Sequence, residues 1–401
     1  MKVKIAFIGV GGYAAYLQKL LRTHVQEDSF EIVCGADPFY EKSEAYPELK
    51  EKSVPLYRTP EEMFSNHKVD LTIVVSPLHF HKKHILLALE NDTHILCEKP
   101  LATTVQDALE IQEAALSKNK KLGVGFQWSF SPTMLALKKD ILSGELGRPL
   151  ALKSFVAWKR YDSYYQGSWK GDLKSKDGDW ILDCVVTNAT AHYLHNMLFL
   201  LGDTIDTAAL PTTTFTEIYR QKDIETFDTC FIKGRFENGC ELFFCASHSP
   251  EINDSPKFVY EFENGTVYMN IYERGSKVTL YRKDGTTKLY GTPETEIENS
   301  NKLKMMIAAV AENAPIPCGV DTILPHLKIC NAMFEEATIH PFVSDRIYCE
   351  KDGESGRFVY GLYNEMEKSF VNGMLPSELG FSWAKGKEAI HPEKMEFFEG
   401  L

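Results

Sequence analysis

The chain has 401 residues, 44% of them hydrophobic, and a formal net charge of −12. This length favours two domains with separate cores, because a single core stops growing at roughly 250–300 residues. The acidic balance argues against a nucleic-acid partner, since phosphate backbones are bound by clustered lysine and arginine. The nine cysteines form no C-x-x-C pair, which is typical of the reducing cytoplasm, where we expect the protein to reside.

The first residues, MKVKIAFIGVGGYAAYL, combine a basic start with an apolar stretch, as a secretory signal does. The glycines within them favour a strand followed by a turn instead. The longest apolar stretch, around Leu71 to Val75, has the length of a buried strand, so we expect no membrane partner.

Short apolar segments alternate with helical patterns from Lys4 to about Phe126, an arrangement typical of a parallel sheet with helices on both faces. Apolar residues at three- and four-residue spacing predict the helices between the strands. The expected strands are Ile5–Val10, Glu31–Ala36, Leu71–Val75, His94–Cys97 and Leu122–Gly125. The expected helices are Tyr13–His24, His81–Glu90 and Val105–Ser117.

The pattern changes after Pro132, where we expect a helix to Ser143, a strand near Leu150–Trp158, a polar loop to Asp179 and a helical run to Leu201. Period-two alternation and turn residues then predict an antiparallel sheet with one solvent-facing or partner-facing side. Its strands are Thr229–Glu237, Glu241–Ser247, Phe258–Glu263, Thr266–Tyr272 and Lys277–Arg282. Later helices are expected near Lys302–Glu312, Thr322–Thr338 and Phe358–Val371.

A glycine-rich turn follows the first strand and opens the first helix, with the pattern G-x-G-x-x-A. Such a turn lets backbone amides approach a pyrophosphate. Its residues are Gly9, Gly11, Gly12, Tyr13 and Ala14. Asp37 ends the second strand, where its carboxylate can bind both ribose hydroxyls and repel a 2′-phosphate, so we predict NAD rather than NADP. The alternative is that Asp37 only caps a turn.

These observations predict an α/β protein with a Rossmann dinucleotide-binding domain over residues 1–128. A C-terminal α+β domain with a large, mostly antiparallel open sheet is expected over residues 129–345. Residues 346–401 are expected to form a C-terminal helix and an extension that packs on the other domains, or to belong to the second domain.

Three further stretches, in this order, resemble the glucose–fructose oxidoreductase, inositol dehydrogenase and rhizopine catabolism (Gfo/Idh/MocA) family. They are Ser76-Pro77-Leu78-His79-Phe80-His81, Cys97-Glu98-Lys99-Pro100-Leu101 and Leu146-Gly147-Arg148-Pro149. The resemblance covers about Lys4 to His340. It implies that Ser76, Pro77, His79, His81 and Glu98 contact the cofactor. It also places Lys99 beside the nicotinamide and the substrate hydroxyl, and it suggests a cis bond before Pro100.

The family also carries an Asp, a Gly and a His at the start of a helix, and the matching segment runs from Gly178 to Asn196. Counting back from Leu201-Gly202, the resemblance gives His192 the role of general acid/base. By that count Asn188 replaces the family's Asp, whereas counting forward from Gly178 gives that role to Asp183. His195 lies one turn after His192 as a candidate substrate contact, with a satisfied core histidine as the alternative.

Other candidate contacts come from the segments that flank this one. Gln127 follows the last strand of the first domain and is a candidate for the nicotinamide ribose or the substrate. Trp158, Trp169 and Lys170 belong to an aromatic and basic loop that suits a glycoside, although its rings could simply bury the loop. The histidines at 79, 81 and 84 lack nearby carboxylates or thiolates in a fitting arrangement, so no metal is expected.

The sequence therefore predicts an enzyme that moves a hydride between NAD and a secondary alcohol of a sugar, cyclitol or glycoside, with Lys99 polarising the oxygen. One alternative is redox-neutral, NAD-dependent glycoside cleavage on the same scaffold. Another is a non-catalytic, dinucleotide-dependent regulator. Because the open sheet would otherwise expose an apolar face, we expect a homodimer or homotetramer formed through it.

Overall fold

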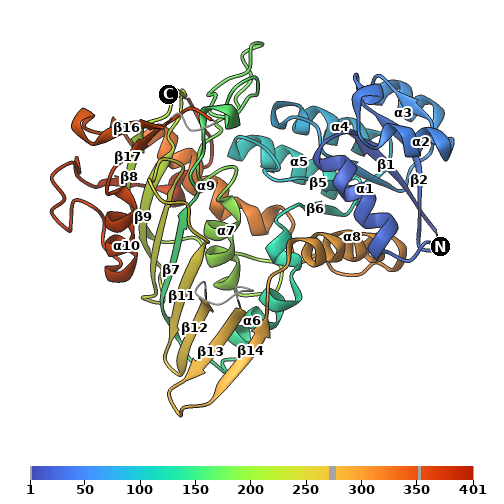
Figure 1. The fold of residues 1–401 in the computed structure, drawn as a ribbon. Helices are drawn as coiled ribbons and strands as arrows, with labels where there is room; N and C mark the ends of the chain where they lie inside the picture. The colour runs from blue at the N-terminus through green and yellow to red at the C-terminus, as the bar shows by residue number, and fades with distance from the viewer. Residues whose placement is uncertain (1, 271–276, 351–353, 401) are drawn as a thin grey trace. The chain divides into compact units, whose positions relative to one another are not determined.

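The computed structural model describes residues 2–270, 277–350 and 354–400, which divide into two compact units (Figure 1). The first unit comprises Met1–Pro132 and Glu294–Ile323, and the second comprises Thr133–Pro293 and Leu324–Leu401. This division differs from the continuous domain predicted over 129–345, because helix α8 (Thr295–Glu312) returns to the first unit. Leu303, Met306 and Ile307 of α8 pack into the first unit's main core cluster.

The first unit contains a six-stranded parallel sheet in the order β3-β2-β1-β4-β5-β6, the strand order of a Rossmann fold. Its strands are β1 (Val3–Ile8), β2 (Phe30–Ala36), β3 (Leu56–Tyr57), β4 (Leu71–Val74), β5 (His94–Cys97) and β6 (Leu122–Val124). Helices α1 (Tyr13–His24), α4 (His81–Glu90) and α5 (Val105–Ser117) have the predicted bounds. The short helices α2 (Tyr46–Glu51) and α3 (Pro60–Asn66) were not predicted.

The second unit contains a ten-stranded sheet, which is mostly antiparallel, as predicted. Nine of its strands follow the order β14-β13-β12-β11-β7-β10-β9-β8-β15, and the tenth, β18, also pairs with β8. Parallel pairing occurs between β7 and β10 and between β8 and β15. The strands are β7 (Pro149–Ala157), β8 (Thr213–Arg220), β9 (Thr229–Arg235), β10 (Glu241–Ser247), β11 (Lys257–Phe262), β12 (Gly265–Asn270), β13 (Lys277–Arg282), β14 (Thr287–Gly291), β15 (Ile339–Pro341) and β18 (Glu388–Ile390). Of the predicted strand Thr266–Tyr272, positions 271 and 272 lie outside the described residues.

The helices of this part of the chain are α6 (Pro132–Leu142), α7 (Ala191–Leu200), α9 (Val320–Glu336) and α10 (Leu362–Asn372). The predicted helical run to Leu201 is wrong over residues 180–190, which form an irregular segment followed by turns at 185–190. There, Leu182 has a φ of 50°, and the hydroxyl of Thr187 accepts a hydrogen bond from the Cys184 amide at 2.9 Å. Such local bonds compete with helix formation. The predicted helix Phe358–Val371 begins later, because β17 (Gly356–Val359) pairs with β16 (Ile347–Glu350).

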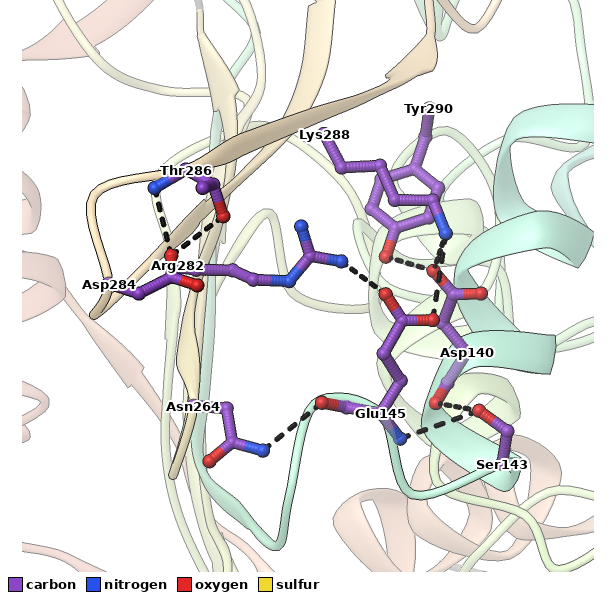
Figure 2. Close-up of polar contacts among 9 residues, drawn as sticks. All are labelled: Asp140, Ser143, Glu145, Asn264, Arg282, Asp284, Thr286, Lys288 and Tyr290. Atoms are coloured by element: carbon purple, nitrogen blue, oxygen red, sulfur yellow. Dashed lines mark hydrogen bonds and ion pairs between the residues drawn. The ribbon is translucent and has the colours of Figure 1, made fainter.

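A polar cluster joins α6 and the turn after it to the β13–β14 hairpin (Figure 2). Asp140 pairs with Lys288 and accepts a hydrogen bond from the Tyr290 hydroxyl at 2.7 Å. Glu145 pairs with Arg282 on the neighbouring strand. These contacts tie the edge strand β14 to the helix, so the edge of the sheet is fixed by side chains.

The C-terminal segment packs on one face of the large sheet, where α10 contacts β7 and β10. The shared apolar cluster includes Phe155, Phe231, Met366 and Trp383, each at most 2% exposed. The described residues after 345 therefore pack within the second unit, and α10 covers part of the sheet face that the sequence leaves open. Beyond this cover, exposed apolar side chains on the same face remain on β12, β13 and β14, namely Tyr268, Tyr281 and Leu289. Among the described residues, no helix has the length and apolarity needed to cross a bilayer.

Candidate active site

The glycine-rich turn lies between β1 and α1, as predicted. Gly9 has a φ of 89°, and a Cβ on it would lie 2.9 Å from the carbonyl carbon and oxygen of Val75, so only glycine fits this close approach. Gly12 precedes the first residue of α1 with a φ of 57° and has open space where a Cβ would be. This geometry leaves the helix N-terminus accessible to a pyrophosphate.

Asp37 directly follows β2, and its carboxylate is held by two backbone amides. Val10 donates to Oδ2 at 3.0 Å and Phe39 donates to Oδ1 at 2.8 Å. Asp37 therefore caps the turn, as the alternative expected. Each of its carboxylate oxygens can still accept a second hydrogen bond. The residues fit an adenosine ribose at this position.

A carboxylate that the sequence did not single out lies at the start of α1. Glu44 Oε2 accepts a hydrogen bond from the Gly12 amide at 3.1 Å. Hydrogen bonds from its own amide and from that of Gly12 lower the pKa of Glu44, so the group is ionised at neutral pH. This carboxylate therefore occupies the Gly12 amide, one of the backbone donors that the turn could otherwise offer to a phosphate.

Replacing this carboxylate by the neutral amide in Glu44→Gln is expected to tighten NADH binding roughly two- to fivefold at low salt, because a like charge is removed from the helix N-terminus. Fluorescence titration of NADH measures the change. Glu51→Gln, which removes a charge from the exposed end of α2, is the matched control. Unchanged or weaker binding in Glu44→Gln would contradict the prediction.

Lys99 follows β5, and the peptide bond between it and Pro100 is cis, as the resemblance suggested. The preceding Glu98 forms an ion pair with Lys302 of α8, whose side chain is 0% exposed. A Cβ at Gly125 would lie 2.5 Å from Glu98 Oε2, so glycine allows the carboxylate to approach the neighbouring strand's end. Lys302 was not identified from sequence, since a lysine inside an apolar helical stretch usually marks a solvent-facing position.

His81 connects two loops at this edge of the sheet. Its Nδ1 lies 2.8 Å from the carbonyl oxygen of Pro100, and its Nε2 lies 2.8 Å from that of Ser76. The ring is 3% exposed, and burial lowers its pKa. His84 Nδ1 lies 2.8 Å from Ser76 Oγ. The position of His81 favours a loop-holding role over the direct cofactor contact proposed from sequence.

Two other predicted cofactor contacts, Tyr13 and Gln127, are joined by the buried side-chain amide of Asn299. The Tyr13 hydroxyl donates to Asn299 Oδ1 at 2.8 Å, and Asn299 Nδ2 donates to Gln127 Oε1 at 3.4 Å. Asn299 is 0% exposed and was not identified from sequence. Ser76 and His79 are partly exposed. In the part of the chain that the structure describes, no group of His, Cys, Asp or Glu is suited to a metal.

The second unit carries the predicted proton-transfer residues. His192 is the second residue of α7 and is partly exposed, as is Asn188. Asp183 is 3% exposed, and its Oδ2 accepts a hydrogen bond from the Gly171 amide at 2.7 Å. His195 is 0% exposed, and burial lowers its pKa, so its placement favours the core alternative over a substrate contact.

The aromatic loop is brought close to this helix in part. Trp158 packs edge-on against Tyr193, the neighbour of His192, with 5.6 Å between ring centroids. Lys170 lies over the Tyr164 ring, 4.2 Å from its centroid. Trp169 is partly exposed. Trp158 therefore contacts the neighbour of the predicted histidine, whereas Lys170 packs on Tyr164 of the loop itself.

The strand order, the glycine turn and the carboxylate after the second strand define a dinucleotide-binding protein. Comparison with known protein families shows which kind of dinucleotide-binding protein this is. Residues 3–126 match the family model described as "Oxidoreductase family, NAD-binding Rossmann fold", and residues 134–268 match the "GFO/IDH/MocA C-terminal domain". The chain belongs to the Gfo/Idh/MocA oxidoreductase family, and its first unit contains the NAD-binding domain.

Relatives of known name are similar over part of the chain. Scyllo-inositol 2-dehydrogenase (NAD(+)) of Bacillus subtilis (strain 168) is 29% identical over 190 residues, which are 46% of this chain and 51% of that protein. D-glucoside 3-dehydrogenase of Escherichia coli (strain K12) is 30% identical over 145 residues, 36% of this chain and 40% of that protein. The matches thus span about half the length of these curated relatives or less.

Solved structures share the fold over most of the chain. WlbA dehydrogenase from Bordetella pertussis, in complex with NADH and UDP-GlcNAcA, is 17% identical with a TM-score of 0.67 and covers 82% of this chain and 94% of its own. Aldose-aldose oxidoreductase from Caulobacter crescentus, complexed with glycerol, is 17% identical with a TM-score of 0.68 and covers 83% and 97%. At such identities the likeness establishes the fold alone.

Proposed function

We propose that the protein is an NAD-dependent oxidoreductase that moves a hydride between nicotinamide and a secondary alcohol of a sugar, cyclitol or glycoside. The observation that carries the proposal is the loop of Lys99, held at the carboxyl edge of the parallel sheet by the Glu98–Lys302 pair and by His81. Ligands of open parallel sheets bind at this edge. The names of the inositol and glucoside dehydrogenases among the relatives agree with this substrate class.

In the proposed reaction, NAD supplies the hydride acceptor. The Lys99 ammonium stabilises the negative charge that develops on the alcohol oxygen as the C–H bond breaks. His192 accepts the hydroxyl proton, so the alcohol loses one hydride and one proton in total. Asp183, whose carboxylate holds the Gly171 amide, and Asn188 assist by orienting the loop and the substrate hydroxyls.

The proposal extends to location and assembly. Eight of the nine cysteines are buried free thiols, which supports a cytoplasmic location. Tyr268, Tyr281 and Leu289 leave an exposed apolar stretch on the sheet, which supports a homodimer or homotetramer through β12–β14. A mass of at least a dimer is expected by light scattering at micromolar concentration, and a monomeric mass would contradict this assembly.

The test of the activity is NADH formation by the purified protein with inositols, aldoses, sugar acids and glucosides, using NAD and then NADP. Turnover with at least one class, and a preference for NAD, is expected. Glycoside cleavage without net NADH would transfer the assignment to the redox-neutral reaction, for which the replacement of the family's Asp by Asn188 is the supporting feature. Tight NAD binding with neither reaction would favour the regulator.

A further inference from the structure

One face of helix α8 contacts three segments at the carboxyl edge of the parallel sheet, all within the first unit. Asn299 of this face forms hydrogen bonds with Tyr13 at the start of α1 and with Gln127 after β6. Three residues later, Lys302 pairs with Glu98 after β5, and its ammonium nitrogen lies 5.5 Å from the centroid of the Tyr13 ring. Residues three apart on a helix lie on one face. Helix α8 therefore contacts the segments from which the candidate cofactor contacts come.

The short 3₁₀ helix Gln127–Phe130, which follows β6, is supported by α8 at both of its ends. Asn299 contacts Gln127 at the first end, and Glu298 forms a hydrogen bond with Ser131, directly after the last residue. Glu298 and Asn299 are 1% and 0% exposed, whereas Gln127 is partly exposed. Buried side chains of α8 therefore support a segment whose first residue reaches solvent.

A backbone carbonyl group fixes the orientation of the Asn299 amide. Nδ2 of Asn299 donates to the carbonyl oxygen of Thr295 at 2.9 Å. Because a carbonyl oxygen can only accept, the NH2 end of the amide lies on that side and Oδ1 lies on the other. Oδ1 accordingly accepts from the Tyr13 hydroxyl at 2.8 Å. The second N–H group of Asn299 is then the donor to Oε1 of Gln127, at 3.4 Å.

The tyrosine hydroxyl is suited to the donor role that this orientation requires. Burial and the nearby Glu98 carboxylate raise the pKa of Tyr13, so its hydroxyl keeps its proton. Tyr16, three residues later on α1, also forms a hydrogen bond with Asn299. Oδ1 has a second lone pair for that hydroxyl, so both protons on Nδ2 keep the partners already described.

The direction of this network decides what Gln127 offers to a ligand. Because its Oε1 accepts from Asn299, its Nε2 remains as the donor end of the side chain. Over residues 2–270, 277–350 and 354–400, no protein group accepts a hydrogen bond from that nitrogen. A donor in this position favours a ligand that presents an acceptor oxygen.

We propose that Asn299 is a positioning residue of the cofactor site. It fixes the amide of Gln127 so that Nε2 is offered to an acceptor oxygen of the nicotinamide half of NAD, either a ribose hydroxyl or the carboxamide oxygen. A glutamine without this contact could turn its amide over and present either end. Asn299 removes that freedom before the cofactor binds, which lowers the cost of ordering the side chain. The inference rests on the proposed function for the assignment of Gln127 to the nicotinamide half, but its test needs no sugar turnover.

Binding of three ligands to the full-length protein tests this role. NADH is titrated by its fluorescence, and ADP-ribose and ADP are titrated by displacement of NADH. ADP-ribose keeps the second ribose but lacks nicotinamide, whereas ADP contains the adenosine half alone. Asn299→Leu is expected to weaken NADH binding about 3- to 10-fold, as the loss of one hydrogen bond gives, and to leave ADP binding unchanged.

The pattern of losses shows which oxygen accepts the hydrogen bond. An equal loss for NADH and ADP-ribose assigns the acceptor to the ribose, and a loss for NADH alone assigns it to the carboxamide. Equal losses for all three ligands would mean that Asn299 only supports the fold. That result, or unchanged NADH binding, would overturn the positioning role.

Variants separate the amide network from the packing of α8. Asn301→Leu is the matched control, because Asn301 is a partly exposed asparagine of the same helix, and it should bind NADH as the wild type does. Gln127→Met removes the proposed donor without altering α8 and should show the same loss as Asn299→Leu, so it also tests the role if Asn299→Leu does not fold. The double variant should lose no more than either single variant, because the two residues act through one contact. Wild-type NADH affinity in Gln127→Met, or losses that multiply in the double variant, would overturn the proposal.

Failure of this inference can be distinguished from failure of the proposed function. Turnover of a sugar together with unchanged NADH affinity in Asn299→Leu and Gln127→Met would overturn the positioning role and leave the proposed function intact. The expected binding losses without turnover of any sugar would support the positioning role and count against the proposed function.

Discussion

Replacing Lys302 by methionine is expected to lower the free energy of unfolding of the first unit by about 3–5 kcal/mol. The Lys302 side chain is 0% exposed and pairs with Glu98, whose side chain is 10% exposed. Methionine fills a similar volume but leaves the Glu98 carboxylate buried without its cation. Loss of one partner is costly because the charge that remains has already lost its water. Urea unfolding followed by circular dichroism measures the change.

Two further variants decide whether the charge is responsible. Lys304→Met, two residues later on the same helix and exposed, is expected to change stability by less than about 0.5 kcal/mol. The double variant Lys302→Met/Glu98→Gln removes both charges and should recover most of the lost stability. If the double variant is no more stable than Lys302→Met, packing rather than the unpaired carboxylate explains the loss.

Local sequence patterns were sufficient for much of the first unit. Helices α1, α4 and α5 have the predicted bounds because their apolar residues recur at helical spacing and the flanking residues end them. The five main strands were each placed within two residues, since buried parallel strands are short continuous apolar segments. The glycine turn and Asp37 could be predicted for the same reason, because their chemistry depends on neighbours in sequence.

Features that depend on distant residues were not predicted. Lys302 meets Glu98 across 204 positions of sequence, and Asn299 meets Tyr13 across 286. No local pattern indicates that α8 returns to the first unit, because an amphipathic helix can pack on either core. Residues 180–190 were predicted to be helical, but hydroxyl-to-backbone bonds such as that from Thr190 to the Val185 carbonyl, at 2.6 Å, favour turns instead.

For the site, the sequence located residues along the chain but did not give their orientation. His81 and His195 were both candidates for ligand contact, yet both rings are buried, one between two carbonyl groups and the other inside α7's core face. Helical spacing places His192 and His195 one turn apart, and only their packing distinguishes the partly exposed ring from the buried one.

Lys99→Met is expected to lower kcat/KM for the preferred sugar about 100- to 1000-fold, the usual effect of removing one group that stabilises a developing oxyanion. NADH affinity should change little, because the turn at Gly9 and the carboxylate of Asp37 hold the other half of the dinucleotide. Steady-state NADH formation and a NADH fluorescence titration measure the two quantities separately. Lys83→Met is the control, since Lys83 is a 69% exposed lysine of the same unit.

The size and type of the loss distinguish the possible roles of Lys99. A fall in kcat with unchanged NADH binding means that the ammonium acts mainly in the transition state, whereas a rise in KM alone means that it only binds the substrate. Lys99→Arg is not expected to restore the rate, because a planar guanidinium cannot replace a compact ammonium in a closely packed loop. Wild-type turnover by Lys99→Met would rule out this lysine as the polarising group and leave His192 as the remaining candidate for the chemistry.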